Sequence, residues 1–345
     1  MSDLGRIEDL PREYVENLAL QNLVPLWPNL RSALPPGIPT RKTQPTCWSY
    51  AAMRPLLMES GELTPMEKAE RRVLVMANPG HGLESLKASA AIYLGMQLIL
   101  PGEWAPSHRH TPNAVRMVVE GEGAYTTVAG ERCEMFRGDL IITPTGLGHE
   151  HEHRGNAPVV WLDVLDLPVI LFAEASYAVE GERQSAHWGS SSNEYLRGGV
   201  VPTTGFERKT SQHALLRFPW SDVKASLQGI AQNAPGNGVA QVAYVNPETG
   251  ADVQSNLGFY AMMLQPGQAT VLPCRSPAVV IHQIEGEFSA ECEGARFHFS
   301  NADPAVFPGF TCTTLRNTSS TEPAFLFMAD EAPLHRKLGV YECRD

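Results

Sequence analysis

Three histidines in the first half of the chain form the pattern with the clearest chemistry. His108 and His110 are separated by one residue, and His149 follows after two turn segments rich in Gly and Pro. Alternate residues of a strand point to the same face, so His108 and His110 share a face while Arg109 points away. Imidazole nitrogens bind zinc, iron and copper at roughly 2.0–2.2 Å. We therefore predict a metal site where these three rings converge inside a small barrel.

The usual fourth partner of such a site is missing from this chain. The segment Thr111–Arg116, directly after His110, contains no Asp or Glu. Three neutral imidazoles leave a divalent ion with roughly its full charge and about three open positions. An unpaired divalent charge is costly inside a low-dielectric barrel, so the open positions should attract an anionic chelate. We expect an acidic aromatic substrate that binds through a carboxylate and an adjacent hydroxyl, with one position left for dioxygen.

Composition and charge limit the other function classes. The 345 residues have room for two domains, and the net charge of −11 argues against nucleic acid or an anionic membrane as a partner. No apolar stretch is long enough for a membrane helix, and the first residues do not resemble a signal peptide. The six cysteines lack CxxC spacing and are expected to be reduced, so the expected compartment is the cytoplasm. The acidic charge leaves open how an acidic substrate is held.

Short strands dominate the chain after a helical beginning. Thr64, Pro65 and Glu67 are typical of a helix start, and a second helix is expected at Pro219–Gln232. Strands separated by glycine-containing breaks are expected at Ala91–Ile99, Val115–Val119, Gly123–Val128, Leu140–Thr143 and Val159–Val164, and again at Leu257–Leu264, Ala278–Ile284, Glu287–Cys292, Ala305–Phe307 and Ala324–Ala329.

The two sets of strands form an internal repeat. The segment Val119–Glu122 matches Ile284–Glu287, and Pro101–Gly102 matches Pro266–Gly267 at the same spacing. We predict a mainly β protein with two tandem, jelly-roll-like β-barrels. The expected parts are an N-terminal helical arm at 1–88, a first barrel at 89–175, a connecting segment at 176–255 and a second barrel at 256–345.

The second repeat lacks the histidines of the first. The position of the histidine pair holds Pro273–Arg275, and the position of the third histidine falls within Thr311–Thr314. The second barrel is therefore expected to bind no metal in this way and to be structural.

The histidines and their flanking glycines together form the two-part signature of the cupin superfamily. A bicupin of this length, with a helical arm and one metal-free barrel, resembles the gentisate 1,2-dioxygenase family, which includes salicylate and 1-hydroxy-2-naphthoate dioxygenases. Pro106–His110 and Gly148–His153 are the most specific parts of the resemblance. It implies Fe(II), dioxygen and a homotetramer. It also implies ring cleavage of gentisate between the carboxyl- and hydroxyl-bearing carbons, giving maleylpyruvate in the catabolism of aromatic compounds.

The resemblance also implies a set of site residues. The iron ligands fall on His108, His110 and His149, and the residues near the substrate are Arg72, Gln97, Arg116, His151 and Asp163, with Tyr93 where some relatives have Trp.

Several of these assignments have support from the residues themselves. Arg116 opens a strand, and a guanidinium can bind a carboxylate through two hydrogen bonds. His151 faces inward two residues after a ligand, where it can hold or move a proton at the substrate hydroxyl. Asp163 is expected to orient His151 or another group of the pocket. Arg72 is expected on a helix, where a surface salt bridge with a nearby Glu is the alternative.

Other functions remain open from the sequence. The same fold can cleave salicylate or 1-hydroxy-2-naphthoate in place of gentisate. A non-catalytic bicupin would bind a metal or a small acid without turnover. A zinc hydrolase is the third alternative, because three histidines also suit zinc-bound hydroxide. Oxygen uptake and the identity of the bound metal distinguish these alternatives.

Overall fold

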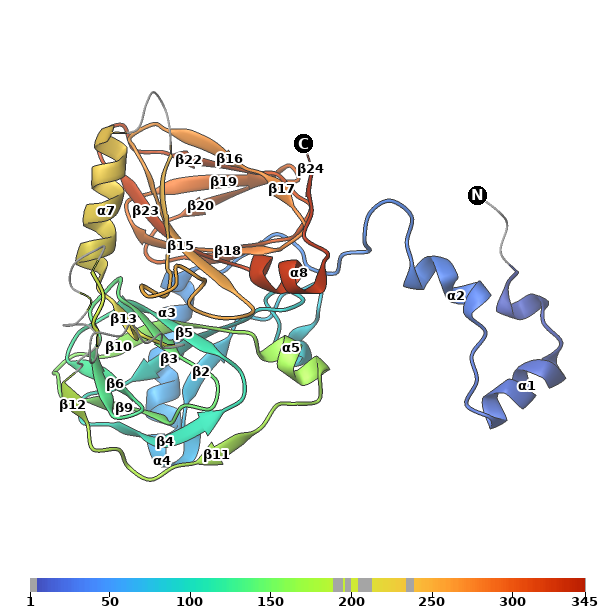
Figure 1. Ribbon diagram of the computed structural model, residues 1–345, viewed down its shortest axis with the longest axis horizontal. Helices are drawn as coiled ribbons and strands as arrows, with labels where there is room; N and C mark the ends of the chain where they lie inside the picture. The colour runs from blue at the N-terminus through green and yellow to red at the C-terminus, as the bar shows by residue number, and fades with distance from the viewer. Residues whose placement is uncertain (1–4, 189–194, 196–199, 204–212, 234–238, 345) are drawn as a thin grey trace. The chain divides into compact units, whose positions relative to one another are not determined.

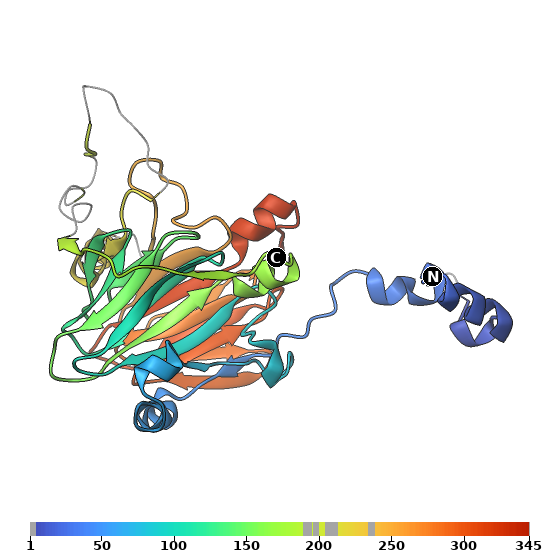
Figure 2. The same cartoon turned by 90° about the horizontal axis from the view of Figure 1, so that it is seen from below.

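A computed structural model describes residues 5–188, 195, 200–203, 213–233 and 239–344. The chain divides into two compact units, Met1–Lys42 and Thr43–Asp345. The first unit carries the short helices α1 (Arg12–Leu20) and α2 (Leu26–Ala33), and neither helix has a buried residue. The second unit holds all of the strands (Figures 1 and 2).

The first barrel consists of two six-stranded sheets, in the orders β13-β8-β5-β10-β3-β2 and β11-β4-β9-β6-β7-β12. Its strands are β2 (Arg72–Val75), β3 (Tyr93–Ile99), β4 (Trp104–His110), β5 (Ala114–Glu120), β6 (Ala124–Val128), β7 (Glu131–Glu134), β8 (Leu140–Thr143), β9 (His149–His153), β10 (Val159–Leu165), β11 (Ala178–Glu180), β12 (His187–Trp188) and β13 (Arg217–Phe218). Strands from the region expected to connect the barrels therefore extend both sheets.

The second barrel repeats this arrangement with sheets β1-β21-β18-β23-β15-β14 and β16-β22-β19-β20. Its strands are β1 (Thr46–Cys47), β14 (Ala240–Ala243), β15 (Gly258–Leu264), β16 (Ala269–Leu272), β18 (Val279–Glu285), β19 (Phe288–Cys292), β20 (Ala295–Phe299), β21 (Pro304–Phe307), β22 (Thr313–Asn317) and β23 (Ala324–Asp330), and β17 (Cys274–Arg275) pairs with β24 (Cys343–Arg344). Within the described ranges, the α-helices of this unit are α3 (Tyr50–Leu63), α4 (Met66–Ala69), α5 (Leu167–Phe172), α7 (Trp220–Asn233) and α8 (Ala332–Leu338). The bicupin architecture predicted from the repeat is confirmed.

The Glu-Gly-Glu turns show why the two halves of the repeat share these residues. Gly121 and Gly286 both have positive φ, +87° and +74°. A Cβ atom at Gly121 would lie 2.2 Å from the carbonyl oxygen of Pro158, and one at Gly286 would lie 2.4 Å from that of Pro323. Only glycine satisfies both the backbone conformation and the close approach, so each turn requires it.

Apolar packing joins the two barrels into one unit. One cluster of buried side chains runs from Met96 and Trp161 of the first barrel to Phe259 and Phe327 of the second. A separate cluster fills the second barrel, where the rings of residues 288 and 299 stack at 4.4 Å. The barrels therefore share part of their core. Among the described residues, no helix combines the length and apolar character that crossing a bilayer would require.

The helix expected after Thr64 is much shorter than the sequence pattern indicated. It lasts one turn, α4, with Pro65 as the N-cap residue. Glu70 then takes a positive φ of 53°, and the chain enters strand β2 at Arg72. Pairing of β2 with β3 outweighs the local helix signal, since a helix of a single turn has little stability of its own.

The expectation that all six cysteines are reduced is wrong for two of them. Cys274 and Cys312 form a disulfide, with their Cα atoms 4.6 Å apart. They come from the two segments of the second barrel that correspond to the histidine segments of the first. Their wide separation in the sequence and the lack of a CxxC motif hid this pairing, which only the fold creates.

Candidate metal centre and substrate cavity

The three predicted histidines converge as expected. The ligand nitrogens of His108, His110 and His149 all lie within 4.8 Å of one another, and this is the one such group of three in the described part of the chain. His108 stands directly opposite His149 in the pairing of β4 with β9. The residue between the first two, Arg109, is exposed. The alternation of a strand thus places two rings beside each other, and the neighbouring strand supplies the third.

Burial holds the three rings neutral. Backbone carbonyl groups orient two of them, while Nδ1 of His108 contacts the guanidinium of Arg71. Nδ1 of His110 is 2.7 Å from the carbonyl oxygen of Pro112, and Nδ1 of His149 is 3.2 Å from that of Leu147. Such bonds at one ring nitrogen direct the other toward a metal. Burial, assisted by nearby arginines and histidines, lowers the pKa of His108 to about 3 and of His110 to about 4, and places that of His149 well below its ordinary value.

Nε2 of His149 gives the sharpest indication of a ligand. This nitrogen is buried and has no hydrogen-bond partner among the described residues. A buried polar atom without a partner costs free energy, and a bound metal ion would remove that cost. The donor set of three imidazoles suits a divalent ion of iron or zinc.

A cavity of about 160 Å³ adjoins the histidines. Its lining is formed by Arg71, Val73, Tyr93, Gln97, His108, His110, Ala114, Arg116, Asp163 and Leu165. Besides two of the three predicted ligands, the cavity therefore includes four of the residues that the resemblance placed near the substrate: Gln97, Arg116, Asp163 and Tyr93. Nε2 of Gln97 is buried without a partner, which leaves it available to a ligand in the cavity.

Two cations and one acid determine the charge of the cavity. Burial and the neighbouring Arg116 lower the pKa of Arg71 to about 10, and burial also lowers the pKa of Arg116. Burial raises the pKa of Asp163 to about 6 even though Arg116 opposes that rise. Two guanidinium groups beside a metal site make an enclosed region that favours an anion. Although the chain as a whole is acidic, the local positive charge of this cavity could therefore hold an acidic substrate.

Known proteins resemble this chain along nearly its whole length. A family model described as a cupin domain matches residues 95–165. A gentisate 1,2-dioxygenase of a Ralstonia species is 63% identical over 342 residues, which span 99% of this chain and 96% of the relative. The chain belongs to the gentisate 1,2-dioxygenase family.

Relatives with other substrates share the fold of this gentisate 1,2-dioxygenase family member. A 5-aminosalicylate 1,2-dioxygenase of a Comamonas species is 31% identical and covers 94% of this chain and 88% of the relative. The structure of salicylate 1,2-dioxygenase from Pseudoaminobacter salicylatoxidans with gentisate matches with a TM-score of 0.89 at 28% identity, covering 97% of this chain and 94% of the other.

Arg71 takes the place in this family member's cavity that sequence reasoning gave to its neighbour. Arg72 lies outside the cavity lining, is buried on the other side of β2 and pairs with Glu103. Arg71 and Val73 share the cavity side because alternate residues of an extended segment do so. The expected helix concealed that alternation. A predicted strand at residues 72–75 would have placed Arg71 on the same side as Val73, and so would have identified it as a residue of the cavity.

His151 and Asp163 are connected through a third residue that the sequence analysis did not consider. Trp161 donates from Nε1 to Asp163 at 3.1 Å, and its ring packs against His151 with centroids 5.0 Å apart. Asp163 thus forms an ion pair with Arg116 and accepts a hydrogen bond from Trp161. In the part of the chain that the structure describes, Asp163 and His151 are not joined by a hydrogen bond. Nδ1 of His151 lies 2.9 Å from the hydroxyl of Thr126, while its Nε2 is buried without a partner.

His153, the third histidine on this face of β9, has a structural position. Its Nε2 is 2.6 Å from the carbonyl oxygen of Ala157, and its Nδ1 accepts from the backbone of Gly155. Both ring nitrogens are therefore occupied in the turn that follows the strand, and none is free for a metal.

Proposed function

We propose that this protein cleaves the ring of gentisate with dioxygen, giving maleylpyruvate, and that it uses Fe(II) held by His108, His110 and His149. One observation supports this proposal above the others. A group of three imidazoles, which includes no carboxylate as a fourth metal ligand, adjoins a cavity that contains two guanidinium groups. The relative that is 63% identical is a gentisate 1,2-dioxygenase, which supports the same substrate.

The metal and the cations divide the task of binding the substrate. Fe(II), when bound, supplies electron transfer to dioxygen and a Lewis-acid contact for the carboxylate and ortho-hydroxyl oxygens of the substrate. Arg71 and Arg116 bind and orient the carboxylate, which fixes the ring against the metal centre. Asp163 keeps Arg116 in place through the buried ion pair. Gln97 provides a further donor from the cavity wall.

His151 manages the proton of the substrate hydroxyl. The hydroxyl of Thr126 is directed toward Sδ of Met135, at 3.7 Å. Nδ1 of His151 then donates to Thr126, which leaves Nε2 as the acceptor. Burial and the nearby Arg116 place the pKa of His151 well below its ordinary value, so the ring is neutral and accepts a hydrogen bond at neutral pH.

Oxygen consumption tests this function directly. Protein purified without added metal is loaded with ferrous iron under anaerobic conditions and mixed with gentisate in oxygenated buffer. We expect oxygen uptake together with the absorbance of the ring-opened product, and neither with zinc-loaded protein as the matched control. A panel with salicylate and 1-hydroxy-2-naphthoate measures substrate preference. Absence of uptake with gentisate, or activity of the zinc form alone, contradicts the proposal.

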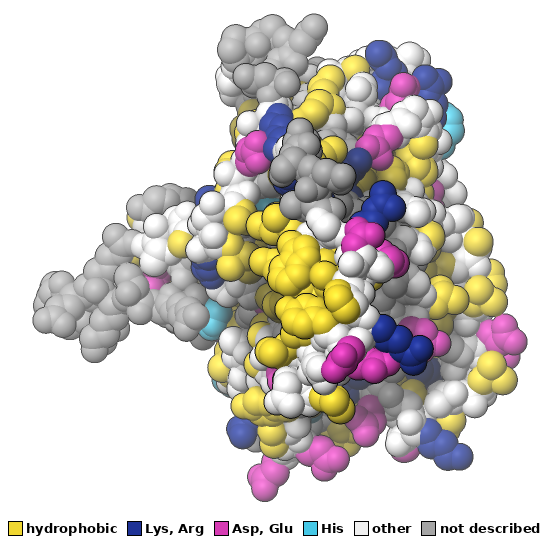
Figure 3. All heavy atoms as spheres, turned by 90° about the vertical axis from the view of Figure 1, so that its right-hand side faces the viewer, with side chains coloured by type: hydrophobic (Ala, Val, Ile, Leu, Met, Phe, Trp, Pro, Cys, Tyr) yellow, Lys and Arg dark blue, Asp and Glu magenta, His cyan; other side chains and the backbone are white. Residues whose placement is uncertain are grey.

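We also propose that the protein assembles as a homotetramer. Exposed apolar residues support association: Leu20 and Val24 on the arm, and Phe172 and Tyr177 on the body, are 77%, 79%, 91% and 64% exposed. Figure 3 shows a group of neighbouring apolar side chains with charged groups around it. Exposed apolar patches of this kind mark contacts between proteins. Light scattering of the full chain measures the mass, and any mass other than that of four chains at micromolar concentration contradicts the proposal.

A further inference from the structure

In each barrel, one long strand is followed by a buried carboxylate at the start of a helix. Asp166 follows β10 and precedes α5, and Glu331 follows β23 and precedes α8. Both residues occupy the N-cap position, where a carboxylate commonly accepts a hydrogen bond from the helix backbone. Neither side chain makes such a bond here. Both carboxylates are instead engaged by segments of the two barrels.

Asp166 connects the first barrel to the segment that enters the second. Its carboxylate accepts from the backbone N–H of Asn113 at 2.7 Å and from Nδ2 of the same residue at 2.9 Å. Nδ2 of Asn256 donates at 2.7 Å to Oδ2, the oxygen that also accepts from Nδ2 of Asn113. Asn256 lies two residues before the first long strand of the second barrel, β15. We call this set of bonds the Asp166 link.

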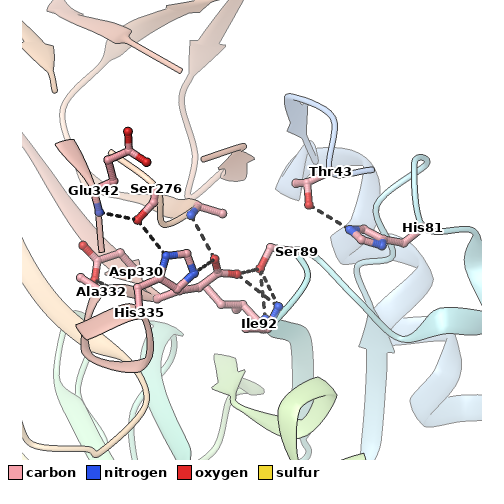
Figure 4. A network of polar contacts seen from close by, with 12 residues as sticks. Thr43, His81, Ser89, Ile92, Ser276, Asp330, Ala332, His335 and Glu342 are labelled. Atoms are coloured by element: carbon pink, nitrogen blue, oxygen red, sulfur yellow. Dashed lines mark hydrogen bonds and ion pairs between the residues drawn. The ribbon is translucent and has the colours of Figure 1, made fainter. Parts of the chain in front are cut away.

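Glu331 makes the corresponding connection in the opposite direction. One of its oxygens accepts from the backbone N–H of Ala278 in the second barrel, at 3.1 Å. The other accepts from the backbone N–H of Ala91 at 3.2 Å and from the hydroxyl of Ser89, both in the segment that enters the first barrel (Figure 4). The internal repeat aligns Ala278 with Asn113 and Ala91 with Asn256. This set is the Glu331 link.

The Asp166 link supports a loop that carries part of the metal site. Asn113 lies between Pro112, whose carbonyl oxygen orients His110, and Ala114, which lines the cavity. Gln254, two residues before Asn256, also donates to the carbonyl oxygen of Ala114, at 2.8 Å. Residues at the entrance to the second barrel thus hold both ends of a short segment behind a metal ligand.

The Glu331 link supports a different wall of the cavity. The Ser89 hydroxyl that donates to Glu331 accepts in turn from the backbone N–H of Ile92 at 3.0 Å. Tyr93 follows at once, begins strand β3 and lines the cavity. His335 of α8 lies 3.6 Å from Glu331 and 2.9 Å from the hydroxyl of Ser276, which holds the carboxylate within the second barrel (Figure 4).

We propose that the second barrel positions the site of the first through these two links, with Asn256 and Glu331 as positioning residues. Asn256 acts on the metal centre through the loop behind His110, and Glu331 acts on the substrate cavity through the turn before Tyr93. The effect on the metal is independent of the proposed substrate. The effect on the cavity rests on the proposed function.

Two variants should separate these effects. Asn256→Ala removes a bond that supports the loop behind His110, and we expect Fe(II) affinity, measured anaerobically against a chelator, to fall about tenfold. Its KM for gentisate, measured at saturating Fe(II), should change little. Glu331→Gln replaces one acceptor oxygen with an NH2 group. This group cannot accept the hydrogen bond that the backbone N–H donates to Glu331. We expect this variant to raise the KM for gentisate about fivefold with unchanged Fe(II) affinity. Ser89→Ala, a milder change in the same link, should act in the same direction as Glu331→Gln.

Asn317→Ala serves as the matched control. This buried asparagine donates to carbonyl oxygens at positions 264 and 322, both within the second barrel. Its loss should lower the melting temperature while metal affinity and KM stay at wild-type values. The proposal is overturned if Asn256→Ala leaves metal affinity unchanged, or if Asn317→Ala shifts both readouts as strongly as the link variants. Because metal affinity is measured without gentisate, failure of the proposed function leaves this half of the test intact.

Discussion

Arg116 and Asp163 stand opposite each other on strands β5 and β10, with 3.4 Å between Nε of the guanidinium and Oδ1 of the carboxylate. Both side chains are buried, and both line the cavity beside the metal centre. The ion pair therefore connects the pH of the solution to the position of Arg116, the group that we propose binds the substrate carboxylate.

Protonation of Asp163 should limit activity on the acid side. Its pKa is raised to about 6, so the carboxylate becomes neutral below that pH and Arg116 loses its partner. We expect kcat/KM for gentisate to fall below about pH 6 in the wild type, and Asp163→Asn to lose this pH dependence and to have a lower kcat/KM at pH 7. Steady-state kinetics between pH 5 and pH 8, conducted at saturating iron, measure this; an unchanged acid limb in the variant contradicts it.

The same group affects folding stability with a defined sign. Because the folded pKa lies above the ordinary value of 3.8, ionised Asp163 lowers the free energy of unfolding. This cost is absent below pH 3.8 and complete above about pH 6. The free energy of unfolding of the wild type relative to Asp163→Asn should therefore decrease as pH rises through this window, as chemical denaturation at several pH values would show. The buried histidines contribute equally to both proteins and cancel in the difference.

Arg71 and Arg72 offer a matched pair of variants. Arg71→Ala removes a charge-assisted contact to the substrate carboxylate, which is typically worth about 1.5–3 kcal/mol. Because Arg71 also contacts Nδ1 of His108, the kinetics are measured at saturating iron, where we expect kcat/KM to fall roughly 10- to 100-fold, mainly through KM. Arg72→Ala leaves Glu103 without its partner and should lower the melting temperature instead. Steady-state kinetics and thermal denaturation of the two variants measure these effects. A larger loss of kcat/KM in the Arg72 variant than in the Arg71 variant would show that Arg71 does not make the main contact with the substrate carboxylate.

Loss of one imidazole should abolish metal binding. His149→Ala removes a buried ligand from the group of three, so we expect bound iron to fall from about one per chain to near zero, together with oxygen uptake. His153→Gln alters a histidine on the same face of the same strand and should keep the iron. Elemental analysis after dialysis compares the two. Retention of iron by the His149 variant would mean that the metal is held elsewhere.

Gly95 keeps the cavity open around Tyr93. A Cβ atom at this position would lie 2.5 Å from Cγ1 of Val73 and 2.7 Å from the hydroxyl of Tyr93. Gly95→Ala should displace Tyr93 and raise the KM for gentisate, with a stability loss of about 1–3 kcal/mol from overpacking. Adding Val73→Ala makes space and should restore part of both. A double variant as impaired as the single one would show that the crowding does not involve Val73.

Reduction of the disulfide should weaken the second barrel. Cys274 and Cys312 are 38 residues apart, and closing a loop of this length contributes about 3–4 kcal/mol in the chain-entropy model. We expect a reductant to lower the free energy of unfolding by that order, and Cys274→Ser to reproduce the loss and to be insensitive to reductant. Alkylation and mass spectrometry count the free thiols. Six free thiols in the unreduced protein would contradict the pairing.

Much of this protein is determined by local spacing in its sequence. The strand at Leu140–Thr143 has the predicted bounds, and helix α7 differs from its predicted bounds by one residue at each end. The convergence of His108 and His110 needs only the alternation of a strand, and the glycine turns that match between the repeats indicate a second barrel without knowledge of any contact. Side-chain period and turn chemistry act over a few residues, so a single sequence shows them.

The tertiary structure alone decided which groups complete the site. Strand pairing overrode the helix signal before Arg72 and so brought Arg71 to the cavity. Folding also joined Cys274 to Cys312, placed Trp161 between His151 and Asp163, and connected the barrels through Asp166 and Glu331. Each of these contacts depends on segments far apart in the chain or on which face of a strand is buried. The sequence specifies them only through the free energy of the complete fold, so no short pattern reveals them.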